Sequence, residues 1–314
     1  MSLTIGVDVG GTKVAAGVVD EGGEILTSTR RPTPSTSPVD VQQTITDLVE
    51  ELRRDYEVVA VGIGAAGFVD VDRATVLFAP NLAWRGEPLR DDVSARIGLP
   101  VVVENDGNAA AWAEYRFGAG RGENNLVCVT VGTGIGGGVV LDGALYRGRY
   151  GIGTEFGHMQ LVAGGRRCGC GQRGCWEQYC SGRALLHEAR EIADVLAADG
   201  ARLLELGGGQ PEGIAAVEVT QAALEGDPAA LACFEEVGTW LGHGLADLAA
   251  MLDPGLFVIG GGVADAGELL LGAARRTYLE RSAATGHTEP AAVRPAQLGN
   301  GAGLVGAADL ARLL

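Results

Sequence analysis

Two stretches of this chain repeat one pattern: an apolar strand, a glycine-rich turn and a second strand that contains Gly-Val-Val. The first is IGVDVGGTKVAAGVVDEG at residues 5–22, and the second is VCVTVGTGIGGGVVLDG at residues 127–143. They match with a slip of one residue, and each ends in a turn with an acidic residue and a glycine. A self-similar unit that recurs along a chain indicates duplication. We therefore expect two lobes of related architecture.

The rest of the chain alternates strand and helix signals, which is typical of an α/β protein. Its 314 residues suffice for two domains with separate cores. The first three expected strands form an antiparallel meander. We expect strands at 5–9, 14–19, 24–29, 58–63, 101–103, 126–131, 138–141 and 256–259, and helices at 41–53, 108–117, 183–197, 231–252, from 263 to about 276, and from 301 to 314.

The charge is strongly acidic, because 24 basic residues stand against 40 acidic ones and give −16. This disfavours nucleic acid and anionic membranes as partners, although backbone amides can still bind a phosphate. The sequence has no secretory apolar region near its start and no apolar stretch of membrane length. We expect a cytoplasmic protein whose thiols stay reduced.

Residues 154–177, TEFGHMQLVAGGRRCGCGQRGCWE, combine one histidine with three closely spaced cysteines. Zinc takes four Cys and His ligands in closed structural sites, so the segment predicts structural zinc. The alternatives are cysteines that merely pack and half of a disulfide framework, which reducing conditions disfavour. The predicted ligands are His158, Cys168, Cys170 and Cys175, and the ion would bring the flanking Glu155 and Glu177 together. We expect no ligand role for Cys128, Cys180, Cys233, His187, His243 and His287.

Three glycine-rich turns follow apolar strands and offer backbone amides to an anion. The first two match neither a Walker A motif nor a dinucleotide fingerprint, because each runs into another strand, whereas both motifs need a helix directly after the turn. Matching turns in the repeated units suggest two lobes that hold a nucleotide phosphate chain, with Mg²⁺ at Asp8. The turn residues are Gly10, Gly11, Thr12 and Lys13; Gly132, Thr133 and Gly134; and Gly260, Gly261 and Gly262.

Glu104-Asn105-Asp106-Gly107 lies between an apolar strand and a helix, where polar side chains usually face a cleft. Asp106 could be the helix N-cap, and Glu104 could be a solvated loop residue. We favour catalysis for Asp106, because phosphoryl transfer to an alcohol needs a carboxylate that orients the hydroxyl and takes its proton.

Several motifs, in this order, resemble the ROK family (repressors, open reading frames, sugar kinases) of the actin-like ATPase and hexokinase superfamily. They are DVGGTK, ENDGNAAAWAE, VTVGTGIGGGVV, TEFGHM, CGCGQRGCWEQY, LDPGLFVIGGG and GAGLVGAADL. The resemblance covers essentially the whole chain and is strongest to actinobacterial-type glucokinases. It implies an α/β, two-lobed actin-like fold with duplicated ribonuclease H-like lobes and a cleft between them. We expect a small lobe at 1–115 with the C-terminal helix 301–314, and a large lobe at 116–300 that carries the zinc loop.

The resemblance also implies a role for each motif. Asp106 would take the proton of the sugar 6-hydroxyl during in-line attack on the γ-phosphorus, and His158 would hold both zinc and sugar. The first two glycine turns would face the phosphates and Mg²⁺, and Gly260–Gly262 the adenosine. Gly67 is expected to approach the sugar, although Ala66 stands where many relatives have proline. The other sugar hydroxyls would be held by Asn105, Glu155, His158 and Glu177.

The predicted function is ATP-dependent phosphorylation of D-glucose at the 6-hydroxyl by a homodimer or homotetramer with structural zinc and with Mg²⁺ bound to ATP. One alternative is a kinase for N-acetylmannosamine, N-acetylglucosamine, fructose or allose. Another is a glucokinase that uses polyphosphate, which the acidic charge disfavours. A sugar-responsive repressor of the same family is disfavoured too, because a strand is expected from about residue 3, where such repressors carry a helix-turn-helix.

Overall fold

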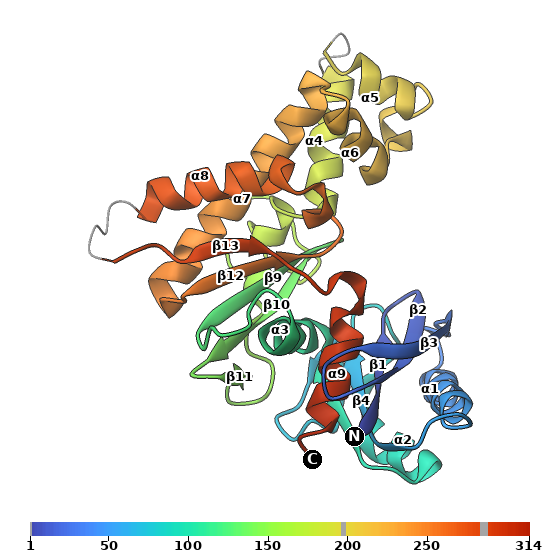
Figure 1. The fold of residues 1–314 in the computed structure, drawn as a ribbon. Helices are drawn as coiled ribbons and strands as arrows, with labels where there is room; N and C mark the ends of the chain where they lie inside the picture. Colours follow the sequence, from blue (N-terminus) through green and yellow to red (C-terminus); the bar gives the residue numbers. More distant parts are fainter. Residues whose placement is uncertain (1, 196–198, 283–287) are drawn as a thin grey trace. The chain divides into compact units, whose positions relative to one another are not determined.

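The chain forms two compact units in a computed structural model that describes residues 2–195, 199–282 and 288–314 (Figure 1). Unit 1 consists of Met1–Cys128, Gly137–Thr154 and Ala296–Leu314, and unit 2 of Val129–Gly136 and Glu155–Pro295. The predicted lobe limits at residues 115 and 300 stay a prediction.

Unit 1 is built on a five-stranded sheet with the order β3-β2-β1-β4-β8. Strands β1 to β3 form the antiparallel meander expected from the sequence, and β1, β4 and β8 are parallel. The register pairs Asp8 with Gly64 and Ala65 with Asn105, so the carboxyl ends of the parallel strands lie at one edge. The strands are β1 Leu3–Val9, β2 Lys13–Val19, β3 Ile25–Pro32, β4 Val58–Ala65 and β8 Val101–Asn105.

Capping residues set where the helices of unit 1 begin. Helix α1 starts before the expected residue 41, because Ser37 caps it and Pro38 suits the first helical position. Helix α3 starts at Asp106, and its cap is Asn105, whose Oδ1 accepts the N–H of Asn108. The capping role considered for Asp106 therefore belongs to Asn105. The helices of unit 1 are α1 Pro38–Leu52, α2 Leu89–Ile97, α3 Asp106–Phe117 and α9 Ala302–Ala311, with the short 3₁₀ helix η5 Gly299–Gly301.

The C-terminal helix α9 packs directly on the sheet and on α3. A Cβ atom on Gly62 of β4 would lie only 1.7 Å from the carbonyl oxygen of Ala307. A Cβ atom on Gly306 would lie 1.8 Å from the carbonyl oxygen of Ala109 in α3. Glycine is needed at both positions because the backbones approach so closely, and the last helix thus completes the core around the first strands.

The second sheet has the order β11-β10-β9-β12-β13. If the five strands of each sheet are numbered in chain order, both sheets have the spatial order third, second, first, fourth, fifth. This shared order confirms the duplication that the repeated sequences predict. Strand β10 begins before the expected residue 138, and β11 and β13 were not expected from the sequence. The strands are β9 Leu126–Val131, β10 Ile135–Leu141, β11 Ala144–Tyr146, β12 Leu256–Gly260 and β13 Ala292–Pro295.

The remaining elements are a small sheet in unit 1 and the helices of unit 2. The small sheet, β5-β6-β7, was not expected and contains Phe68–Val69, Val76–Phe78 and Arg85–Glu87. The helices are α4 Gly182–Val195, α5 Ala201–Leu206, α6 Ala216–Leu224, α7 Pro228–Leu252 and α8 Glu268–Ser282, with the 3₁₀ helices η1 Phe156–His158, η2 Trp176–Gln178, η3 Pro211–Gly213 and η4 Ala264–Ala266. Residues 196 and 197 of the expected helix 183–197, and His287, lie outside the described residues.

Three cysteines expected to pack do so. Cys128, Cys180 and Cys233 are buried, and burial raises the pKa of each thiol.

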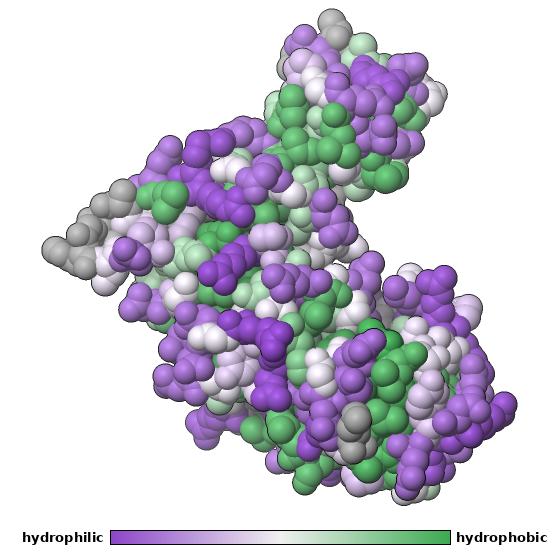
Figure 2. Space-filling view, viewed as in Figure 1, coloured by the Kyte–Doolittle hydropathy of each residue, from purple (hydrophilic) through white to green (hydrophobic). Residues whose placement is uncertain are grey.

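Among the described residues, no helix has the length and apolar character needed to cross a membrane. Figure 2 shows hydrophobic and hydrophilic residues interspersed over helices α4 to α6, where Val217 and Leu224 are exposed. Single exposed apolar residues of this kind are ordinary and mark no binding site.

Candidate active site

The carboxyl edge of the first sheet gathers several of the predicted site residues. Asp8 lies near the end of β1, Gly67 follows β4, and Asn105 and Asp106 stand where β8 meets α3. The Nδ2 of Asn105 donates to the carbonyl oxygen of Gly67 over 3.1 Å. Ligands of open α/β sheets bind outside the carboxyl ends of the parallel strands. The structure thus places these residues where the fold provides a site.

The surroundings of Asp106 raise its pKa to about 6. Burial of the carboxyl group is the main cause, and the negative charge of Asp8 adds to it. The N–H of Gly107, which donates to Oδ1 over 2.9 Å, acts in the opposite direction. Burial also raises the pKa of Asp8, although the charge of Lys13 opposes this shift. A carboxyl group with a pKa near 6 is mostly ionised at pH 7 and still accepts a proton readily.

The first predicted phosphate turn joins β1 to β2 at the same edge. The N–H of Gly10 donates to the carbonyl oxygen of Lys13 over 3.0 Å and closes the turn. Thr33 Oγ1 donates to the carbonyl oxygen of Gly10 over 2.8 Å. A Cβ atom on Gly11 would lie 3.1 Å from the Cβ of Asn81, so the backbone runs close to a neighbouring loop. These contacts hold the turn beside the two aspartates.

In unit 2, the second and third predicted turns lie around the end of β9. Gly261 has φ of +90°, and a Cβ atom there would lie 2.5 Å from the backbone of Val131. The N–H of Val263 donates to the carbonyl oxygen of Val131 over 3.0 Å. The N–H of Gly182, the first residue of α4, donates to the carbonyl oxygen of Gly132 over 2.8 Å. The two turns and the start of α4 therefore form one cluster.

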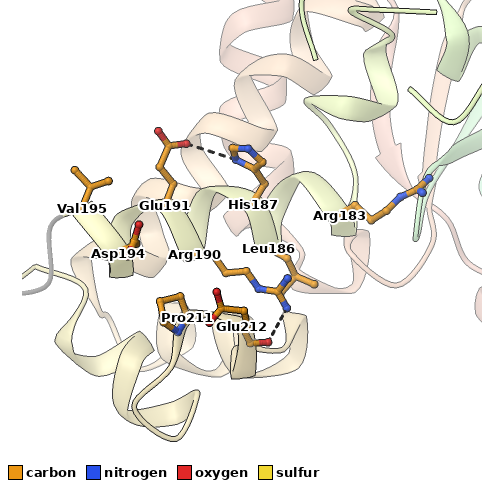
Figure 3. A pocket seen from close by; sticks show the side chains of 9 residues that line it. All are labelled: Arg183, Leu186, His187, Arg190, Glu191, Asp194, Val195, Pro211 and Glu212. Carbon is orange, nitrogen blue, oxygen red and sulfur yellow. Dashed lines mark hydrogen bonds and ion pairs between the residues drawn. The ribbon is translucent and has the colours of Figure 1, made fainter. Parts of the chain in front are cut away.

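Arg183 was not among the predicted residues, yet it lies at this cluster. Its Nε donates to the carbonyl oxygen of Thr133 over 3.0 Å, and its Nη2 lies 3.5 Å from Glu177 Oε2. A groove of about 710 Å³ runs along α4 toward η3, with Arg183 at one end (Figure 3). Charged and apolar side chains line it: Arg183, Leu186, His187, Arg190, Glu191, Asp194, Val195, Pro211 and Glu212.

The four predicted zinc ligands come together in unit 2. The ligand atoms of His158, Cys168, Cys170 and Cys175 all lie within 4.8 Å of one another. Cys168 Sγ is 3.6 Å from His158 Nδ1, and Cys170 Sγ is 3.6 Å from Cys175 Sγ. The latter distance excludes a disulfide, whose sulfur atoms are about 2.05 Å apart. Three thiolates and one imidazole suit tetrahedral zinc, so these residues fit the predicted ion.

Backbone geometry and one buried aromatic residue shape the zinc loop. Gly174 has φ of +79°, and a Cβ atom there would lie 1.7 Å from the carbonyl oxygen of Val162. Trp176, next to the last cysteine, is fully buried, and its Nε1 donates to the carbonyl oxygen of Trp240 in α7 over 2.8 Å. The loop is therefore anchored to the helical core of unit 2 directly beside the predicted metal ligand Cys175.

The two glutamates that flank the ligands differ in their surroundings. Glu177 is buried, and its Oε1 lies 3.0 Å from Cys168 Sγ. Glu155 is exposed and immediately precedes η1, which ends at His158. His187, for which no partners were expected, lies near Glu188 and Glu191. Because exposed groups one helical turn apart commonly pair in this way, we assign no site to them.

Glu104 is no solvated loop residue, contrary to the alternative considered from the sequence. It is 1% exposed and forms ion pairs with Arg73 and Arg147. The one signal in the sequence was its place at the end of an apolar strand, where a side chain is often buried. A buried carboxylate needs compensating partners. Both arginines are remote in the sequence, so local patterns could not identify them.

Comparison with known proteins gives close matches over the whole chain. The model of the ROK family matches residues 4–313. The glucokinase of Streptomyces coelicolor is 53% identical over 313 residues, which are 99% of this chain and 98% of that protein. A ROK family glucokinase from Streptomyces griseus, solved in complex with glucose and AMPPNP, is 53% identical, with a TM-score of 0.90 and 100% of both chains covered. The ROK hexokinase from Thermus thermophilus is 38% identical, with a TM-score of 0.80 over 99% of this chain and 98% of that one.

Replacing Cys175 with serine should abolish zinc binding, because the site would lose one of its thiolates. Metal analysis of the purified variant should find zinc lost, and the fluorescence of the neighbouring Trp176 should change. Cys233→Ser is the matched control, since Cys233 is equally buried but lies in α7. Full zinc content in Cys175→Ser would show that the ligand set is wrong.

Replacing Asp106 with asparagine should stabilise the protein at pH 7.5. Asparagine can still accept the Gly107 N–H but brings no charge beside Asp8. The folded-state pKa of Asp106, about 6, exceeds the ordinary value of 3.8, so ionised Asp106 destabilises the folded protein. This destabilisation is absent below pH 3.8 and grows as pH rises through 6. We expect the free energy of unfolding to rise by about 1–3 kcal/mol at pH 7.5. Urea denaturation at pH 5 and 7.5 measures this, and no gain at the higher pH would contradict the raised pKa.

Proposed function

Since the chain belongs to the ROK family, we propose that it is a glucokinase that transfers the γ-phosphoryl group of ATP to D-glucose. The observation that carries this conclusion is the 53% identity to Streptomyces glucokinases over essentially the full length of both chains. The chain has the two-lobed actin-like hexokinase fold, with the duplicated ribonuclease H-like lobes predicted from its sequence.

We assign to Asp106 the removal of the proton from the sugar 6-hydroxyl. As that oxygen forms its bond to the γ-phosphorus, its proton passes to the carboxylate, and the bond from the γ-phosphorus to the bridging oxygen breaks to release ADP. The pKa of about 6 supports this role, because the base is ionised near neutral pH and remains basic enough to react. Asp8 would hold the Mg²⁺ that accompanies ATP, and this ion would neutralise phosphate charge.

The sugar contacts follow from side chains that can pair with hydroxyl groups. Carboxylates and amides at fixed positions reject sugars of the wrong shape, because a mismatch leaves buried polar groups unpaired. Zinc would have a structural role and would set His158 and Glu177 on a rigid loop. We propose that glucose is held by Gly67, Asn105, Glu155, His158 and Glu177.

The donor contacts follow from the glycine turns and the groove along α4. The turns at Gly10–Lys13 and Gly132–Gly134 would bind phosphates, and Gly260–Gly262 would lie on the adenosine side. Because Arg183 contacts the second turn and lines one end of the groove, we place the nucleoside of ATP in the groove. Mixed apolar and polar walls suit a base and a ribose. The acidic net charge of −16 disfavours polyphosphate. The cytoplasmic location and the homodimer or homotetramer remain predictions.

A coupled assay with a panel of sugars and donors tests the proposed function. Glucose with ATP should give the highest kcat/KM, above N-acetylmannosamine, N-acetylglucosamine, fructose, allose and polyphosphate. Asp106→Asn should lower kcat roughly 10²–10⁴-fold while glucose still binds, and the activity of the unmodified enzyme should fall below about pH 6. Asp91→Asn, at an exposed carboxylate of α2, is the control. Preference for another sugar would refute the glucokinase assignment, and near-normal turnover of Asp106→Asn would refute the base.

Replacing Arg183 with methionine tests the donor site. The variant keeps the length of the side chain but loses the charge at the end of the groove. We expect KM for ATP to rise roughly tenfold, as for the loss of a charged hydrogen bond, and KM for glucose to change less. Arg202→Met, at an exposed arginine outside the groove, should leave both constants unchanged. An unchanged KM for ATP in Arg183→Met would exclude the nucleoside from this end of the groove.

A further inference from the structure

The candidate base is preceded in β8 by a carboxylate that is more buried than the base. Glu104 is 1% exposed, whereas Asp106 is partly exposed. Glutamate is rarely buried to this degree unless positive charges or several hydrogen bonds compensate for the lost water. The groups that contact Glu104 therefore show how the surrounding structure compensates for the burial of its charge.

Two guanidinium groups share the Oε2 atom of Glu104. Arg73 Nε donates to it over 2.9 Å. Arg147 Nε lies 2.8 Å away, in an ion pair whose angle is poor for a hydrogen bond. Arg147 is held in turn, because its two Nη atoms donate to the carbonyl oxygens of Val71 and Asp70 over 2.8 and 2.7 Å. The negative charge is thus fixed by two cations. Arg73 belongs to the turn that follows β5, and carbonyl oxygens of the same turn hold Arg147 in place.

The Oε1 atom of Glu104 faces the segment that carries Asp106. It accepts the backbone N–H of Asn105 over 2.9 Å and the Nδ2 of Asn108 over 3.1 Å. Asn105 also caps α3 and donates to the carbonyl oxygen of Gly67. The hydrogen bonds to Oε1 therefore hold the last residue of β8 and the first turn of α3, and Asp106 stands between them.

Asn108 extends the cluster to a residue with a strained backbone. Thr154 Oγ1 lies 3.2 Å from Asn108 Oδ1 and shares its hydrogen with the carbonyl oxygen of Gly153. Thr154 has φ of +73°, a region that β-branched residues rarely adopt. Such strain persists where the surroundings impose it, and it gathers at functional sites. Thr154 directly precedes Glu155, one of the proposed sugar ligands.

A buried ion cluster is a poor source of stability, since packed apolar residues of similar volume often stabilise as well or better. The position of this cluster gives a better reason for it. We propose that Glu104 is a positioning residue for phosphoryl transfer: held by Arg73 and Arg147, its carboxylate fixes the backbone that carries Asp106. The inference rests on the proposed function, because it takes Asp106 as the base.

Glu104→Gln tests this role, because glutamine keeps the shape and an acceptor for Asn105 but loses the charge that pairs with the arginines. We expect kcat to fall roughly 10–100-fold, the effect of moving a reacting group by about 1 Å. KM for ATP should stay within about twofold of its original value, since the donor contacts are unchanged. The acidic limb of the pH profile should stay near pH 6, because Asp106 still titrates beside Asp8.

Glu114→Gln is the matched control. Glu114 is also 1% exposed and lies near the other end of α3, where its oxygens accept the N–H groups of Ala119, Gln297 and Leu298. This variant should lower the midpoint of thermal unfolding without lowering kcat of the folded protein. If Glu104→Gln likewise loses only stability, its role is structural and the inference is wrong.

Arg73→Gln provides a second variant if Glu104→Gln does not fold, because the Arg73 side chain is 27% exposed. It should lower kcat less, again without changing KM for ATP, and an unchanged kcat would overturn the inference. Asp106→Asn separates the two claims. Near-normal turnover of that variant rejects the base itself. Loss of its turnover, together with normal kcat in Glu104→Gln and Arg73→Gln, rejects only the positioning role.

Discussion

The proposed catalysis depends on keeping one carboxylate, that of Asp106, ionised at a place where the fold disfavours its charge. Asp106 loses water on burial and lies near the negative charge of Asp8, and both effects raise its pKa to about 6. The ionised form is therefore less stable than it would be in water and accepts a proton more readily. The same effect that makes the carboxylate a better base lowers the stability of the folded chain, a common exchange at active sites.

The architecture of unit 1 explains how this arrangement is held. The order β1-β4-β8 brings Asp8 and Asp106 to the carboxyl edge of one sheet, although the two residues are far apart in the sequence. Asn105 caps α3 and leaves the carboxylate of Asp106 available. Helix α9 approaches β4 so closely that Gly62 cannot carry a side chain. The ion cluster of Glu104 adds hydrogen bonds on both sides of Asp106.

Local patterns predicted the parts of the structure that depend on local chemistry. The first meander, the duplicated sheet and the convergence of His158 with three cysteines were all visible as residue periods or spacings. The short sheet β5-β7 and strand β13 were missed, because few residues carry their pattern. Asn105 and Asp106 are both good caps, so only the backbone geometry separates them. Glu104 and Arg183 were missed because distant partners, and no local motif, define what they do.

If the fold tunes Asp106 into a base, the pKa of its carboxyl group is the quantity that shows it. Carbon-13 NMR of protein labelled at the aspartate carboxyl carbons would follow its titration, with the Asp106→Asn variant identifying the signal. We expect a midpoint of about pH 6 in the unmodified enzyme. A midpoint near the ordinary value of 3.8 would contradict the account, because burial and Asp8 would then have no effect on the proposed base.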